Sequence, residues 1–163
     1  MQEHIEDRCN IRQKENPKLL QNARAFLDCD DLNDLRLLLD DVKKSKAVVV
    51  MLTKKYFTRP WCLAELHAAI QSNIPIIPVK VVDGGYDFEE GKRFLSTLTP
   101  ESLDTESKGA SEVLKDIGID VTELGKKLAD VIPNIIALPF NPSGSKNVIN
   151  AQIDDIIEKV LKF

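Results

Sequence analysis

A run of five consecutive apolar residues, Val48-Val-Val-Met-Leu52, most constrains what this chain can fold into. Three of the five are β-branched, and a short apolar run without alternation is typical of a strand that is buried on both faces. Strands of this kind occur in parallel sheets that helices cover on both sides. We therefore expect an α/β fold in which Ala47–Leu52 is one of the strands.

The segment after this run predicts a helix that carries a candidate site. Pro60 suits the first turn of a helix, because its missing N–H is not needed there. The helix from Trp61 onward carries the only tryptophan of the chain and, four residues later, Glu65. Residues four apart share one helical face. A carboxylate beside an indole, just beyond the carboxyl end of a buried strand, is where open α/β sheets place their ligand sites.

The bulk composition excludes several classes of function. The 163 residues suffice for one domain, and 43% hydrophobic with 29% charged residues is typical of a soluble globular protein. The net charge is −4, and the one basic tract, Lys43–Lys46, has no interleaved aromatic residues, so we expect no nucleic-acid partner. No apolar run reaches about 18 residues, so we expect no membrane span. No charged n-region followed by an apolar h-region opens the sequence, so we expect no secretory signal.

The cysteines and histidines predict neither a disulfide framework nor a metal site. Cys9, Cys29 and Cys62 are odd in number and lack metal-ligand spacing, so thiols in a reducing, cytoplasmic compartment are the simplest interpretation. The two histidines, His4 and His67, are too scattered for a metal site, and we expect solvated or packing imidazoles.

Strand-like runs alternate with helical periodicity along the rest of the chain. This alternation predicts a parallel sheet with right-handed crossovers. The four expected strands are Ala25–Leu27, Ala47–Leu52, Ile74–Val82 and Asn134–Leu138. Two prolines in Ile74–Val82 remove ladder donors, which favours a position towards the edge of the sheet.

Helices are expected between these strands and at the carboxyl terminus. They start near Leu35, Trp61, Asp87, Ala110, Asp120 and Ile149, and the polar segment Thr99–Lys108 is expected to be a loop. Asp87 with Glu90, and Asp120 with Glu123, have the spacing of capping boxes. A helix ends at Gly118 and another at Pro133.

Several segments together resemble a known family. They are Phe26-Leu-Asp-Cys-Asp-Asp-Leu32, Leu37-Leu-Leu-Asp-Asp-Val42, the apolar strand at Val48, and Tyr56-Phe-Thr-Arg-Pro-Trp-Cys-Leu-Ala-Glu-Leu66. This combination resembles the Toll/interleukin receptor (TIR) domain, most closely the TIR-type domains of protists, algae and plants. The string Trp-Cys-Leu-X-Glu-Leu is the most specific part, and the resemblance is strongest from Ala25 to Lys80.

The resemblance implies a flavodoxin-like, three-layer α/β/α fold with the sheet order B-A-C-D-E. The four expected strands would be B, C, D and E in chain order, in a single TIR-like domain over residues 1–163. The family's strand A, an extended opening segment with Ser, His and Arg residues, is not found. Residues 1–24 instead look like a helical segment, the remains of the first crossover. Two explanations stay open: a fragment of a longer protein, or a natural variant with a four-stranded sheet.

The resemblance also implies an enzymatic function. Many TIR domains cleave NAD at the nicotinamide–ribose bond with a glutamate in helix C, and Glu65 matches that position. A carboxylate near the ribose could bind its hydroxyls and stabilise the oxocarbenium character that develops. Trp61 could pack against a ring, and Asp28, Asp30 and Asp31 are candidate substrate contacts in the loop that gates the site. The plain alternative is a solvated helix glutamate beside a core tryptophan.

A second hypothesis is a non-catalytic interaction module in signal transduction, of the kind found in innate immunity. TIR domains assemble with other TIR domains or with a second copy through the loop after strand B. Here that loop comprises Asp28, Cys29, Asp30, Asp31, Leu32 and Asn33, and it could dock on a basic surface. An acidic helix amino terminus that only complements the helix dipole is the structural alternative. The two functions are compatible, and neither requires a metal or a cofactor other than NAD as substrate.

Two further enzyme or switch classes share the fold class. A response-regulator receiver would use an acidic pair, a Thr and a Lys, which Asp30/Asp31, Thr53 and Lys80 imitate, but the phospho-acceptor Asp is missing. A Mg²⁺ site at the acidic loop is rejected with it. A nucleoside deoxyribosyltransferase-like enzyme is a minor alternative. Cys62 lacks a histidine partner, because His67 lies about 140° away around the helix, so a small buried hydrophobic residue is expected there.

Overall fold

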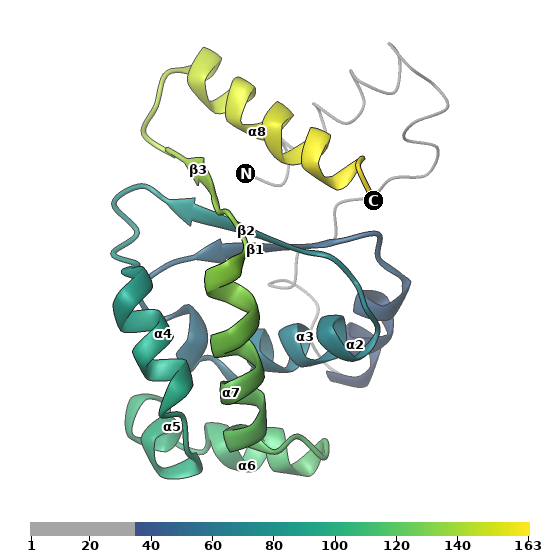
Figure 1. Ribbon diagram of the computed structural model, residues 1–163, viewed down its shortest axis with the longest axis vertical. Helices are drawn as coiled ribbons and strands as arrows, with labels where there is room; N and C mark the ends of the chain where they lie inside the picture. The colour runs from purple at the N-terminus through teal and green to yellow at the C-terminus, as the bar shows by residue number, and fades with distance from the viewer. Residues whose placement is uncertain (1–34) are drawn as a thin grey trace.

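The computed structural model describes the backbone from Leu35 to Phe163 and the side chains from Leu39 onward. The segments predicted within residues 1–34, including the strand Ala25–Leu27 and the acidic loop that follows it, lie outside the described residues. The described part contains seven α-helices and three strands (Figure 1). In chain order they are α2 (Leu35–Lys44), β1 (Val48–Leu52), α3 (Pro60–Gln71), β2 (Ile76–Val81), α4 (Phe88–Ser96), α5 (Pro100–Glu106), α6 (Ala110–Asp116), α7 (Val121–Val131), β3 (Leu138–Phe140) and α8 (Lys146–Val160).

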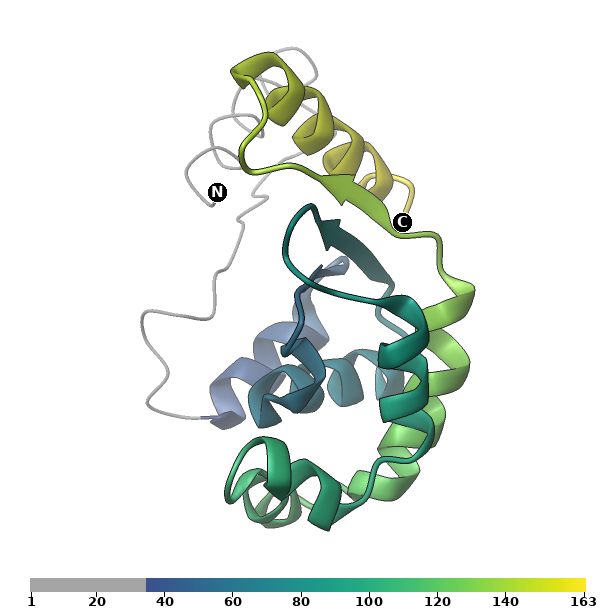
Figure 2. The ribbon, with the colours of Figure 1, turned by 90° about the vertical axis from the view of Figure 1, so that its left-hand side faces the viewer.

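The three strands form one parallel sheet in the order β1-β2-β3. Val50 pairs with Pro78, and Val79 pairs with Leu138. Helices lie on both faces of this sheet: α8 covers one face, and α2, α3, α4 and α7 lie on the other (Figures 1 and 2). The α/β class with a parallel sheet is therefore confirmed.

Alternation along the strands divides the apolar core into two clusters. Val50 and Leu52 of β1 point to the larger cluster, which includes α3, while Ile77 and Val79 of β2 point to the smaller cluster under α8. This alternation follows from the two-residue period of a strand. It explains why Val48–Leu52 shows no alternation in its sequence, since both faces of the sheet are apolar.

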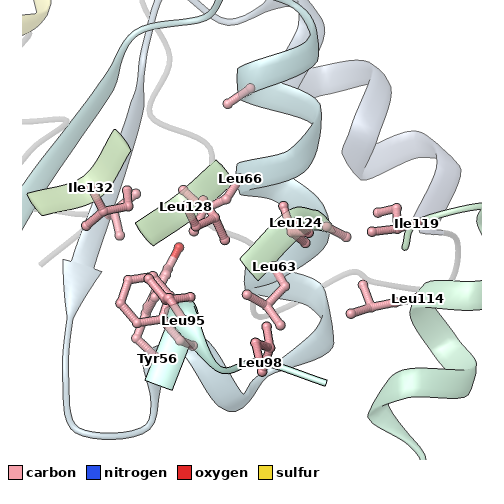
Figure 3. Close-up of a cluster of buried hydrophobic side chains, with 14 of the residues drawn as sticks. Tyr56, Leu63, Leu66, Leu95, Leu98, Leu114, Ile119, Leu124, Leu128 and Ile132 are labelled. Carbon is pink, nitrogen blue, oxygen red and sulfur yellow. The ribbon is translucent and has the colours of Figure 1, made fainter. Parts of the chain in front are cut away.

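The larger cluster is built from helices that are far apart in the sequence (Figure 3). Leucines of α3, α4, α6 and α7 interdigitate there, and all are almost fully buried: Leu63, Leu66, Leu95, Leu114, Leu124 and Leu128. Residues of α6 and α7 thus share one core with α3, which carries the candidate glutamate.

The expectation that β2 lies towards an edge is wrong for the described sheet, because β2 pairs with both neighbours. The N–H of Val82 donates to Phe140 O at 2.8 Å, so even-numbered residues of β2 direct their main-chain groups to β3. The nitrogen of Pro78 therefore faces the position just before β3 begins. A central strand tolerates this proline because no ladder bond is needed there.

The same proline explains why the last strand is shorter and later than expected. The predicted strand Asn134–Leu138 is wrong: β3 spans Leu138–Phe140, and residues 132–134 continue α7 as a short 3₁₀ turn, η2 (Ile132–Asn134). By the two-residue period, the carbonyl of Ile136 would have to accept from residue 78, which has no N–H. Pairing therefore starts at Leu138, and the Ile136 side chain is 85% exposed.

The predicted loop Thr99–Lys108 is also wrong, because it contains α5. The Thr99 side chain accepts from the N–H of Ser102, and the Ser102 hydroxyl accepts from the N–H of Thr99, which together form a capping box followed by Pro100. Because the segment is mostly polar, its sequence resembles a loop even though it contains these signals for the start of a helix. The predicted caps Asp87 and Asp120 are confirmed, each accepting at 2.8 Å from the N–H three residues later.

Candidate functional site

The helix that carries Trp61 and Glu65 starts as the sequence predicted. A short 3₁₀ turn, η1 (Tyr56–Thr58), follows β1, Arg59 is the extended N-cap residue of α3, and Pro60 is in its first turn. Because the three strands are parallel, the chain leaves β1 at the carboxyl edge of the sheet. The first turns of α3 therefore lie near that edge, where open α/β sheets place ligand sites.

Helix α3 is buried on most of its circumference. Its buried residues are Leu63, Ala64, Leu66, Ala68 and Ala69. At about 100° per residue these side chains are spread around the helix rather than gathered in one stripe. Helices with buried residues all round lie inside the fold, and the polar side chains of Glu65 and His67 on α3 are partly shielded from solvent.

Glu65 is half-buried in the second turn of α3. Trp61, four residues earlier on the same face, is also half-buried. The neighbours one turn later, Ala68 and Ala69, are small and buried. The carboxylate therefore lies between an indole and two short side chains on one helix. This placement differs from the fully solvated glutamate of the plain alternative.

The neighbouring residues of α3 fit the structural interpretation given to them. Cys62 is half-buried and packs against the larger core cluster. His67 is half-buried; burial lowers the pKa of its imidazole below the ordinary value of 6.5, and the positive charge of Lys127 on α7 lowers it further. Both causes disfavour the charged imidazolium. The half-buried imidazole fits the packing role expected for His67.

Four aromatic side chains form a contiguous row at the carboxyl edge of the sheet. This aromatic row consists of Tyr56, Phe57, Tyr86 and Phe88, with ring centroids 5.4, 5.9 and 5.1 Å apart along the row in edge-to-face contacts. The Lys80 ammonium lies 5.2 Å from the centroid of the Phe88 ring. These contacts join the loop after β1 to the loop after β2.

Sequence reasoning missed the aromatic row. A pair of aromatics directly after one predicted strand, and two more shortly after the next, was the available pattern. Parallel strands end at the same edge, so these loops had to meet. Burial raises the pKa of the Tyr86 phenol to about 12, with a further contribution from the charge of Asp87.

The described structure does not include the predicted site residues of the acidic loop. Asp28, Cys29, Asp30, Asp31, Leu32 and Asn33 lie outside the described residues. Thr53 follows β1, and Lys80 packs on Phe88. Within residues 35–163 no group of three or more His, Cys, Asp or Glu side chains could hold a metal ion. No helix in this part of the chain is long and apolar enough to cross a membrane.

Comparison with known families settles the identity of the fold. The TIR domain family matches residues 17–115, more than half of the chain. The chain belongs to the TIR domain family. The matched part of this TIR domain includes β1, β2, Trp61 and Glu65. No curated protein matches the chain.

Proposed function

We propose that this TIR domain cleaves NAD at the nicotinamide–ribose bond, with Glu65 as the catalytic carboxylate, and that it does so in a self-associated state. The observation that carries the proposal is the half-buried Glu65, which shares a helical face with Trp61 near the carboxyl edge of a parallel sheet. The family match over residues 17–115 supports the proposal, because it covers this segment.

The chemistry requires a negative charge near the sugar. When the bond between the ribose C1′ and the nicotinamide nitrogen breaks, its electron pair leaves with neutral nicotinamide, and positive charge develops on the ribose. A carboxylate at Glu65 would stabilise this charge and accept hydrogen bonds from ribose hydroxyls. Water then adds to C1′ and releases a proton, which gives ADP-ribose. Partial desolvation of Glu65 strengthens its electrostatic effect on the transition state.

A second part of the proposal concerns the extent of the domain and its assembly. We infer that residues 1–163 form a single TIR-like domain with a four-stranded parallel sheet that lacks the family's strand A, in which the first predicted strand adds to the β1 side of the sheet. The shared core of α3, α6 and α7 supports this extent, because it joins residues inside and beyond the matched segment. The acidic loop Asp28–Asn33 remains a predicted contact for a second copy or another TIR domain.

The test measures nicotinamide release from NAD by the purified chain, both free in solution and clustered on vesicles through a terminal tag. We expect slow release in solution and faster release on the vesicles. Glu65→Gln removes the charge at nearly constant volume, so nicotinamide release should fall about 100-fold. Glu112→Gln, an exposed glutamate of α6 within the matched segment, is the matched control and should behave as the unaltered chain.

Two results would contradict parts of this proposal. Equal nicotinamide release by the Glu65→Gln variant and the unaltered chain would exclude Glu65 as the catalytic carboxylate. No release by either protein, even when clustered, would leave a non-catalytic, homotypic interaction module as the function of the domain. Circular dichroism of each variant ensures that activity is compared between folded proteins.

A further inference from the structure

Two contacts connect the loop after β1 to the loop after β2. The N–H of Lys54 donates to Gly84 O at 2.9 Å. The rings of Phe57 and Tyr86 are in contact, with centroids 5.9 Å apart and planes at 63°. Both aromatic side chains are buried, so this contact excludes water from the space between the two loops. The loop that precedes α3 is therefore held against a loop from a different strand.

On one side, this connection continues into the helix that carries Glu65. Phe57 lies in η1, and the N–H of Arg59 donates to Tyr56 O at 3.4 Å. The N–H of Leu63 in turn donates to Arg59 O at 3.1 Å, as the first regular bond of α3. Glu65 lies two residues further along. A shift of the Phe57 ring therefore acts on the first turns of α3 through a continuous main-chain path.

On the other side, Tyr86 is fixed by α4. Its ring contacts Phe88, the first residue of α4, at a centroid distance of 5.1 Å. Its hydroxyl lies so close to Gly91 that a Cβ at that position would be 2.5 Å from the oxygen. The glycine is thus required for the tyrosine to lie flat against the helix. Tyr86 is held on this side while its ring supports Phe57 on the other.

We propose that Tyr86 is a positioning residue for Glu65, because its ring fixes Phe57 and thereby the start of α3. This inference rests on the proposed function, and it adds that the loop after β2 determines how well the glutamate is aligned with the ribose. Tyr86 acts through Phe57 and needs no contact with NAD. A small displacement of a catalytic group lowers the rate of the chemical step more than it weakens substrate binding.

The experiment compares Tyr86→Leu with Tyr86→Phe in the full chain, clustered on vesicles. Tyr86→Leu keeps an apolar side chain but removes the ring contacts, and we expect kcat for nicotinamide release to fall about tenfold with KM within about twofold. Tyr86→Phe keeps the ring and should retain the kcat of the unaltered chain. Trp61, the only tryptophan, is in the first turn of α3, so its fluorescence emission reports the same displacement without any activity. Its emission maximum should shift in Tyr86→Leu only.

Ile153→Ala is the matched control, because Ile153 is fully buried on the opposite face of the sheet, under α8. It destabilises the fold without touching the aromatic row, so kcat and Trp61 emission should stay unchanged at a temperature where all variants are folded. If Tyr86→Leu does not fold, Phe57→Leu removes the same contact from the other side and should give the same two changes.

The inference is overturned if Tyr86→Leu keeps both the kcat and the Trp61 emission of the unaltered chain, or if Ile153→Ala reproduces its effects. If the unaltered chain releases no nicotinamide, the proposed function fails, and Trp61 emission alone decides the inference. An unshifted emission in both Tyr86→Leu and Phe57→Leu would then disprove the coupling between the loop after β2 and α3.

Discussion

Glu65 and His67 are two residues apart on α3, and their side chains lie in different surroundings. Two residues correspond to about 200° around a helix, so the side chains point to nearly opposite sides. Burial lowers the pKa of the His67 imidazole, and the positive charge of Lys127 on α7 lowers it further. Glu65 shares its side with Trp61 and small alanines. Packing accounts for the histidine, and the catalytic role proposed for Glu65 depends on the other side of the helix.

The lowered pKa of His67 predicts a pH dependence of stability. The folded-state pKa lies below the unfolded value of 6.5, so the unfolded chain binds more protons between these two values. The contribution of neutral His67 is complete above about pH 6.5 and is lost as the pH falls through the lower, folded-state pKa. Urea unfolding at several pH values between 7.5 and 5 should therefore show falling stability, and His67→Gln should flatten this dependence.

Lys127→Gln provides the matched control for the histidine, because it removes the second cause of the shift and leaves the first. Burial is the larger cause, so this variant should retain most of the pH dependence. A His67→Gln variant with the same pH dependence as the unaltered chain would show that other groups are responsible.

At the scale of elements, α4 and α7 approach each other closely at Gly125. A Cβ at this position would lie 2.6 Å from Leu95 O and 2.6 Å from the Leu98 Cβ. One obstacle is main chain and the other is the first side-chain carbon, so neither can rotate away. The close approach brings Leu124 and Leu128 into the larger core cluster.

Gly125→Ala should destabilise the fold even though alanine is the better helix former. Overpacking of this kind costs about 1–3 kcal/mol, which exceeds the helix-propensity gain of about 1 kcal/mol. Chemical denaturation gives the change in unfolding free energy. Lys126→Ala, at the exposed neighbouring position of α7, should be nearly neutral. A Gly125→Ala variant more stable than the unaltered chain would mean that the two helices can separate without loss.

The elements differ in how far the sequence specified them. Val48–Leu52 and the Pro60 helix start were predictable, because burial on both faces and a proline in the first turn leave direct patterns in the sequence. The helix after Thr99 was not, because the polar residues that form its capping box are also typical of a loop. The position of β3 depends on Pro78 in another strand, and the pairing of Phe57 with Tyr86 depends on the order of the strands. Neither can be deduced from local sequence alone.

At the scale of the whole molecule, one sheet separates two apolar clusters, and we predict that they form in one cooperative transition. Ile153→Ala and Leu66→Ala remove fully buried side chains from opposite faces. Each should lower the unfolding free energy by about 2–5 kcal/mol. If residues up to Phe163 belong to a single domain, both variants shift one common cooperative transition.

Asp155→Ala, on the exposed side of α8, controls for changes in that helix and should leave the transition in place. Thermal unfolding followed by circular dichroism and by Trp61 fluorescence provides two probes in different parts of the fold. Separate transitions by the two probes, with Ile153→Ala affecting only one of them, would show that α8 folds as an independent unit.

The proline in β3 limits how copies of this domain can associate at that edge of the sheet. Phe140 directs its main-chain groups to β2, so Pro139 directs its nitrogen to the outer side of β3, where it offers no hydrogen to an incoming strand. With only three residues in β3, one missing donor removes the regular ladder. Copies of this domain therefore cannot stack into a continuous sheet through β3. In any filament of these domains, contacts at the β3 edge must therefore be made by side chains. Weakening those side-chain contacts would be enough to separate the copies there.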